Sequence, residues 1–244
     1  MAMASKPMLC RGCWEQMHVP VPIRGPLAPL ARLLGIQRSN MNPDVCTVCE
    51  SMFEKVMRRR NIIVDLTILF ADLRGFTEIS EAVDQDRLRG LLDFFYDECA
   101  AAIWEQDGLL NKTIGDAVMA IFNFPLGHAD HPVRAVGTAR EIQRRCAERC
   151  KRMSSEAGLE TRGLGVGIGI HTGPTAFGEF GTAHRELTAI VSVVNIAARL
   201  QAAAGAGEVL VTRAVVDRLA AGESKGTREC ALKGLVQPIT AFLV

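Results

Sequence analysis

Two aspartates stand beside apolar, strand-like segments. Asp72 follows the β-branched run Ile62–Ala71, and Asp116 lies in the tight turn Ile114-Gly115-Asp116 between two shorter apolar runs. If the first strand pairs antiparallel beside that hairpin, both carboxylates reach one place. Paired carboxylates with few neighbouring His or Cys residues suit hard cations such as Mg²⁺ or Mn²⁺. Two such ions activate a hydroxyl and stabilise a leaving phosphate, so the pair predicts metal-assisted phosphate chemistry.

Four cysteines near the N-terminus form a second set of candidate ligands. Cys10 and Cys13 make one C-x-x-C pair, and Cys46 and Cys49 make another. Two such pairs supply four thiolates in a tetrahedral array, which favours structural Zn²⁺. The interval between the pairs is longer than the usual ribbon spacing, and an iron–sulfur cluster uses the same ligands. We expect zinc, with an iron–sulfur cluster, thiol chemistry and a metal-free state as the alternatives.

The composition divides the chain near residue 60. Residues 1–49 hold four of the eight cysteines and six of the ten prolines, with little hydrophobic periodicity. Residues 50–61 have the pattern of a short connecting helix with apolar side chains on one side. We therefore predict a Cys-rich, metal-binding module over 1–49, a linker helix over 50–61 and one larger domain over 62–244.

The larger domain alternates strand-like and helix-like segments. It opens with a buried strand over Ile62–Ala71, followed by a helix over about 78–106 that Thr77 caps. The later elements are expected in this order: strands Leu109–Thr113 and Ala117–Phe122, a helix from Asp130 to about 155, a strand Gly163–His171, a hairpin Pro174–Ile190, a helix Val193–Ala203, a strand Val209–Val211 and closing strands near 229–243. This order predicts an α+β, ferredoxin-like (βαββαβ) sheet with helices on one face.

Charge and hydropathy exclude several classes of function. The net charge of +1 and the aromatic content of 5% argue against a nucleic-acid partner. No run reaches the roughly 18 to 20 apolar residues of a membrane span, so none is expected. The N-terminus lacks the apolar core of a signal peptide, which predicts a cytoplasmic protein with reduced or metal-bound thiols.

Five segments carry a family resemblance. FADLRGFTEIS, KTIGDAVMAIF, GIGIHTGPTAFGEFG, VNIAARL and LKGLVQPITAFLV occur in that order along the chain. They closely resemble successive motifs of the class III adenylate and guanylate cyclase catalytic domain. The resemblance covers about residues 62–244 and implies a nucleotide cyclase, a phosphorus–oxygen lyase.

The resemblance also implies a set of catalytic and metal-binding roles. Asp72 and Asp116 correspond to the ligands of two Mg²⁺ or Mn²⁺ ions per site, assisted by the main-chain carbonyl of Leu73. Asn195 and Arg199 correspond to the pair that stabilises the transition state. Because these two are spaced i, i+4, they lie on one face of a helix.

Three further residues correspond to substrate-binding positions. Lys112 and Thr188 match the positions that contact the purine, and Lys233 matches the lysine that holds the terminal phosphates. Adenine presents N1 as an acceptor and N6 as a donor, which a donating lysine and an accepting threonine complement. Guanine would set its N1–H against Lys112, so ATP is the expected substrate. A guanylate or dual-specificity cyclase is the alternative.

In the family that these motifs resemble, the metal-binding aspartates come from one subunit, and the Asn, Arg and phosphate lysine come from the other. The chain carries both sets, which predicts an active homodimer with two equivalent sites. One departure is Val191-Ser192, where the family has Gly-Asp; Ser192 is expected to cap the following helix. A catalytically silent, dimerising nucleotide-binding module is therefore a second alternative. A zinc-ribbon nucleic-acid binder is a third, which the near-neutral charge disfavours.

Overall fold

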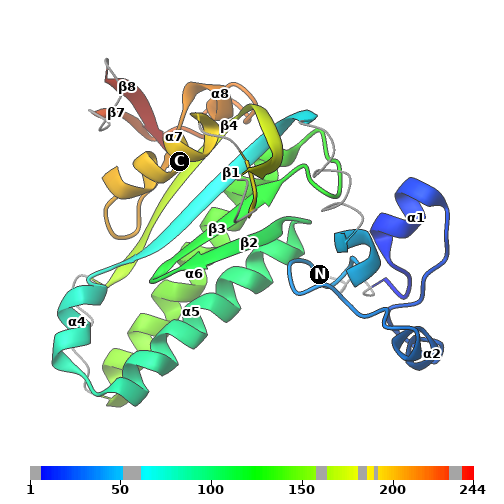
Figure 1. Ribbon diagram of the computed structural model, residues 1–244. Coiled ribbons are helices and arrows are strands. Elements are labelled where there is room, and N and C mark those ends of the chain that lie inside the picture. Colours follow the sequence, from blue (N-terminus) through cyan, green and yellow to red (C-terminus); the bar gives the residue numbers. More distant parts are fainter. Residues whose placement is uncertain (1–6, 52–61, 158–163, 181–185, 190–191, 231–237) are drawn as a thin grey trace.

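A mixed β-sheet forms the main body of the protein (Figure 1). The computed structural model describes residues 7–51, 62–157, 164–180, 186–189, 192–230 and 238–244. The strands are β1 (Ile62–Arg74), β2 (Leu109–Ile114), β3 (Ala117–Phe122), β4 (Gly165–Phe180), β5 (Glu186–Ala189), β6 (Val209–Val211), β7 (Gly226–Cys230) and β8 (Ile239–Leu243). Their order is β2-β3-β1-β4-β6-β8-β7, and β5 pairs with β4.

The helices lie on both faces of this sheet and beside its β2 edge (Figure 1). They are α1 (Arg11–Met17), α2 (Ala28–Leu33), α4 (Phe76–Ala82), α5 (Gln85–Glu105), α6 (His131–Ala157), α7 (Ser192–Ala203) and α8 (Arg213–Val216). A further helical turn begins at residue 47, and most of the predicted linker helix over 50–61 lies outside the described residues. Within the described part of the chain, no helix is both long enough and apolar enough to cross a bilayer.

The predicted βαββαβ unit is present. Strands β1, β2, β3 and β4, with α5 and α6 between them, form the antiparallel order β2-β3-β1-β4 of a ferredoxin-like sheet. Helices α5 and α6 share one face of it. The expectation that all helices lie on one face is wrong, because α7 packs on the opposite face.

Strand β1 separates the two layers by simple alternation. Side chains at odd positions, such as Leu69 and Ala71, join the layer beneath α5 and α6. Side chains at even positions, such as Ile68 and Phe70, join the layer beneath α7. Asp72 is at an even position, so its carboxylate lies on the α7 side of the sheet.

The helix predicted over 78–106 is instead two helices, α4 and α5. Gly75, not Thr77, is the N-cap residue of α4. Asp84 adopts an extended backbone and its carboxylate accepts the N–H of Arg87 at 2.9 Å, which starts α5 as a separate helix. The strand predicted to end at His171 continues as β4 to Phe180 and then pairs with β5 in the expected hairpin.

Glycines in β4 allow α7 to lie directly on the sheet. A methyl group on Gly169 would lie 2.8 Å from the Cα of Gln201, and closer still to the carbonyl oxygen of Ala197. A methyl group on Gly167 would lie 2.9 Å from the carbonyl oxygen of Ala204. Neither position has room for a side chain, so the glycines fix how closely α7 approaches the end of β1.

Candidate active site

The two aspartates meet where β1 ends beside the β2–β3 turn. Asp72 stands opposite Ala117, the residue that follows Asp116, and the N–H of Leu73 donates to the carbonyl of Asp116 at 3.2 Å. Burial raises the pKa of Asp72, and the neighbouring Asp116 carboxylate raises it further. The fold thus brings together two acidic side chains that are distant in the sequence.

The main chain of Leu73 faces the same turn. In an antiparallel ladder the N–H and C=O of one residue point toward the same neighbouring strand. Because the Leu73 N–H bonds to the Asp116 carbonyl, the Leu73 carbonyl also faces the β2–β3 turn. The oxygen that sequence reasoning named as a third ligand therefore lies on the correct side of β1.

Two residues that sequence reasoning missed hold the Asp72 carboxylate. Arg74 Nη1 donates to Asp72 Oδ2 at 2.9 Å, and Gln201 Nε2 donates to the same oxygen at 2.7 Å. Arg74 also donates to the main-chain carbonyl of Gln201. Both hydrogen bonds fall on Oδ2. Among the described residues no side chain contacts Oδ1, which leaves that oxygen to bind a metal ion.

The donor set suits a hard divalent cation. It consists of two carboxylates and a facing carbonyl, and oxygen is the ligand that Mg²⁺ and Mn²⁺ prefer. The negative charges of Asp72 and Asp116 repel each other, which contributes to the raised pKa of Asp72. A bound cation would relieve that repulsion. The Arg74 guanidinium already supplies one positive charge to Asp72. These residues fit the metal that the sequence predicted.

Tyr96 supports the turn from the helix side of the sheet. Its hydroxyl, on α5, donates to the carbonyl of Gly115. Burial raises the pKa of Tyr96, and the Asp116 carboxylate raises it further, so the phenol stays protonated and can donate. Gly115 itself has φ of +59°, a conformation that glycine adopts without strain. Tyr96 therefore fixes the turn that carries Asp116.

Lys112 shares the sheet face of Asp72. It pairs with Met119, whose side chain belongs to the layer beneath α7. Directly opposed residues in an antiparallel pair point to the same face, so the half-buried Lys112 lies on the α7 side of β2. The predicted purine contact, Lys112, and the predicted metal ligand Asp72 are thus on one side of the sheet.

Of the two predicted catalytic residues on helix α7, Asn195 is exposed and Arg199 is half-buried. Val193, Ala197 and Leu200 are buried against the strands, whereas Asn195 is exposed. Gln201 contacts Asp72, and Asn195 lies almost two turns earlier, about 9 Å along the helix axis. The fold therefore does not bring Asn195 onto the Asp72 carboxylate of the same chain.

The remaining substrate positions are only partly described. Thr188 lies in β5 and pairs with Gly178, but its side chain lies outside the described residues. Lys233 and Val191 also lie outside them. Ser192 is the first residue of α7, and its predicted cap, which depends on the side chain, is not among the described features.

The four N-terminal cysteines converge as the sequence predicted. Their sulfur atoms all lie within 4.8 Å of one another, and all four side chains are buried. The other cysteines are separate free thiols: Cys99, Cys146, Cys150 and Cys230. Among the cysteines of the described part of the chain, only Cys10, Cys13, Cys46 and Cys49 form a candidate metal centre.

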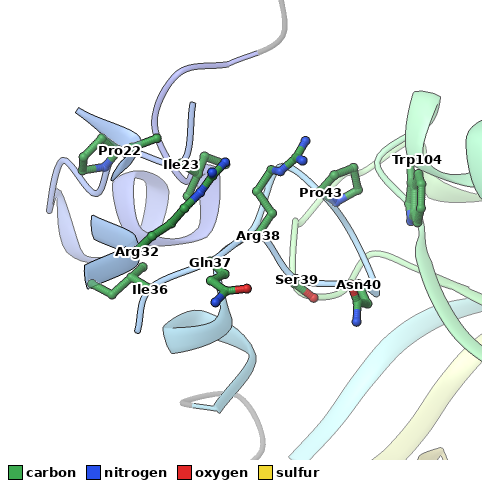
Figure 2. A pocket seen from close by; sticks show the side chains of 11 residues that line it. Pro22, Ile23, Arg32, Ile36, Gln37, Arg38, Ser39, Asn40, Pro43 and Trp104 are labelled. Carbon is green, nitrogen blue, oxygen red and sulfur yellow. The ribbon is translucent and has the colours of Figure 1, made fainter. Parts of the chain in front are cut away.

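A cavity of about 480 Å³ lies beside α2, away from the paired aspartates. Figure 2 shows Arg32 at one side of it, Arg38 in the middle and Trp104, from the end of α5, at the other side. Its lining includes no acidic side chain. None of the site residues predicted from the sequence lines it.

Comparison with known sequences agrees with this architecture. The profile described as "Adenylate and Guanylate cyclase catalytic domain" matches residues 60–244. An adenylate cyclase from Anabaena cylindrica is 32% identical over 166 residues, which is 67% of this chain and 32% of that protein. A terminal-differentiation specific adenylate cyclase from Dictyostelium discoideum is 31% identical over 63% of this chain and 7% of its own length. The chain thus spans a third or less of these curated relatives.

Solved structures show the same similarity over most of the chain. The adenylyl cyclase CyaB from P. aeruginosa aligns with a TM-score of 0.67 and 29% identity, covering 76% of this chain and 95% of that one. The guanylyl cyclase Cya2 aligns with a TM-score of 0.68 and 25% identity, covering 75% and 93%. Adenylyl and guanylyl cyclases are therefore equally close in fold.

Proposed function

Because the chain belongs to the adenylate and guanylate cyclase catalytic-domain family, we propose that it converts ATP to 3′,5′-cyclic AMP and pyrophosphate. Family membership identifies a nucleotide cyclase, a phosphorus–oxygen lyase. The observation that carries the proposal for this chain is the meeting of Asp72 and Asp116 at the end of β1. We propose these two carboxylates and the Leu73 carbonyl as the ligands of two Mg²⁺ or Mn²⁺ ions.

The chain's own groups position an intramolecular attack of the ribose 3′-hydroxyl on the α-phosphate. When bound, the two divalent ions would favour ionisation of that hydroxyl and neutralise the leaving pyrophosphate. Asp72 is held in place by Arg74 and Gln201, so its free oxygen has a fixed direction. Tyr96 fixes the turn that carries Asp116. Such preorganisation supplies rate without covalent chemistry by the protein.

Selection of adenine is proposed to rest on Lys112 and Thr188. Support comes from the place of Lys112 on the same sheet face as Asp72, where its ammonium can donate to N1 of adenine. Thr188 would accept from the exocyclic amine. Lys233 would hold the terminal phosphates.

A homodimer is proposed as the active form. On one chain Asp72 contacts Gln201 in the C-terminal turn of α7, and Asn195 is exposed to solvent. A second copy can therefore supply Asn195 and Arg199 to the aspartates of the first, and the reverse contact forms a second site. Arg199 would then stabilise charge that develops on the phosphate.

The test is product formation from ATP or GTP by the full chain with Mn²⁺. We expect cyclic AMP from ATP, and at least a 100-fold loss in Asp72→Asn with no loss of stability, because burial and Asp116 already disfavour the charged form of Asp72. Cyclic GMP alone would replace ATP with GTP as the substrate. No product from either nucleotide would favour the silent nucleotide-binding module.

A mixing experiment tests the shared site. Asp72→Asn and Arg199→Ala are each expected to be inactive alone. In an equal mixture half the dimers are mixed, and each mixed dimer has one intact site of two, so about one quarter of the wild-type activity should return. Absence of any recovery, with subunit exchange verified by labelled chains, would refute the dimeric site.

A further inference from the structure

The N-terminal cysteines surround a single point. Cys13 Sγ lies 3.0 Å from Cys49 Sγ and 3.5 Å from Cys46 Sγ, and Cys10 Sγ lies 3.6 Å from Cys49 Sγ. Four sulfurs that each lie 2.3 Å from one tetrahedral ion are about 3.8 Å apart. A disulfide would require about 2.05 Å. The four sulfurs are therefore spaced for one shared ion.

The same spacing argues against an iron–sulfur cluster. In a cluster of two or four irons the cysteines bind different irons, so their sulfurs stand apart on the outside of the cluster. Here all four sulfurs lie within 4.8 Å of one another. No room remains among them for additional iron and sulfide.

The surrounding backbone supports charged sulfurs. Cys10 Sγ accepts the N–H groups of Cys13 at 3.4 Å and Cys46 at 3.1 Å, and Cys46 Sγ accepts the N–H of Cys49 at 3.5 Å. A methyl group on Gly12 would lie 3.1 Å from Cys49 Sγ, so the backbone between Cys10 and Cys13 packs closely against the four sulfurs. All four ligands are buried, as in a structural zinc site without an open position.

This centre is joined to the cyclase sheet at the start of β2. The carbonyl of Met41 accepts the N–H of Leu110 at 3.0 Å and the indole N–H of Trp104 at 2.7 Å. Asn42 Nδ2 donates to the carbonyl of Gly108 at 3.0 Å. Because β2 is an edge strand, its Leu110 N–H has no partner within the sheet, and the Met41 carbonyl supplies one.

An ionic contact and an apolar contact complete the junction. Arg11, which lies between two of the cysteine ligands in the sequence, pairs with Asp107, two residues before β2 begins. Asp107 also lies 3.1 Å from Arg134 Nη1 and 3.0 Å from His128 Nε2. Leu126, from the loop after β3, packs within the cysteine cluster. Hydrogen bonds and an ion pair thus link the sulfur centre to the start of β2, and Leu126 links it by apolar packing to the loop after β3.

We propose that Cys10, Cys13, Cys46 and Cys49 bind one Zn²⁺, and that this ion holds residues 41–42 against the edge of β2. The ion thereby fixes the strand that carries Lys112. Metal binding and edge pairing stand independently of the cyclase reaction. Only the consequence for turnover rests on the proposed function.

The test begins with the metal. Full-length protein is expected to contain one zinc per chain, and Co²⁺ in its place should give the visible absorption of a tetrahedral thiolate site. Cys46→Ser should lose the metal, and Cys150→Ser, a thiol on α6 outside the cluster, should keep it. A brown protein that contains iron and sulfide, or purified protein with no bound metal, would overturn the proposal.

The coupling is tested by amide hydrogen exchange. Zinc removal by a chelator should speed exchange of the Leu110 N–H at least tenfold and leave β1 and β4 unchanged. Asn42→Ala should keep its zinc and still speed exchange near Gly108, which separates loss of docking from loss of folding. Unchanged exchange at Leu110 after verified zinc loss would overturn the coupling.

Turnover is the final readout. Zinc-depleted protein should form product at least fivefold more slowly, with recovery when zinc is restored. If no nucleotide is cyclised by the zinc-loaded protein, the proposed function fails while the metal and exchange results still decide the zinc proposal. If zinc loss alters exchange at Leu110 and leaves turnover unchanged, the proposal that the placement of β2 affects turnover fails instead.

Discussion

Replacement of Gly169 by alanine tests how α7 is seated on the sheet. The added methyl group would lie 2.8 Å from the Cα of Gln201 and nearer to the Ala197 carbonyl. Both obstacles are helix backbone, which cannot rotate aside as a side chain does. The perturbation therefore forces α7 away from β4.

The size of the effect follows from the geometry. Carbon atoms at optimal contact are about 3.5 to 4.0 Å apart, so the helix must move by at least about 0.7 Å. Overpacking of this kind costs about 1 to 3 kcal/mol, and a backbone obstacle places Gly169→Ala near 3 kcal/mol. For a chain of this size that is a fall of about 6 to 12 °C in the melting temperature.

The assay is urea or thermal unfolding of the variant beside Gly173→Ala. In the same strand, a methyl group on Gly173 would meet its nearest neighbour, Val193, at 3.7 Å, which is ordinary contact. Gly173→Ala should therefore change the unfolding free energy by less than about 1 kcal/mol. Equal stability of the two variants would refute the argument that β4 glycines seat α7. Displacement of Gln201 should also lower cyclase activity in Gly169→Ala alone, since Gln201 holds Asp72.

Two further predictions concern stability. Burial lowers the pKa of His171 from 6.5 to about 4. Below pH 6.5 the unfolded chain therefore takes up a proton that the folded chain does not, and the unfolding free energy should fall by up to about 3 kcal/mol between pH 6.5 and 4. The variant His171→Asn should lack this part of the pH dependence. An identical pH dependence of stability in the wild type and in His171→Asn would contradict this prediction. The second prediction concerns Gly90→Ala in α5, where the added methyl group meets no atom within 4 Å; the substitution should raise the unfolding free energy by about 0.5 to 1 kcal/mol in urea titrations. A destabilised variant would show that exposed helical Gly90 has a role other than local flexibility.

Local patterns predicted most strands and the meeting of the two aspartates. The β-branched run at Ile62 and the turn at Gly115 are strong signals because they depend on neighbouring residues alone. The second helix layer was missed, although Ile62–Ala71 is apolar at nearly every position. A strand apolar on both faces requires cover on both, and this rule would have placed a helix on each side.

Residues that reach the site through tertiary packing were not predictable. Gln201 contacts Asp72 because the glycines of β4 bring α7 close, and no spacing in the sequence records that distance. Tyr96 reaches Gly115 across the layer between α5 and the sheet. The break between α4 and α5 did have a local signal, because Asp84 is a strong N-cap residue followed by a helix former.

The alternation along β1 ties the apolar layers to the reactive end of the strand. Were β1 to slide by one residue against its neighbours, every side chain would exchange faces. Asp72 would then point into the apolar layer under α5 and α6, and Ala71 or Leu73 would take its place on the side where the nucleotide is expected. Side chains such as Leu66 and Leu69, which never touch substrate, therefore safeguard the placement of a carboxylate several residues further along.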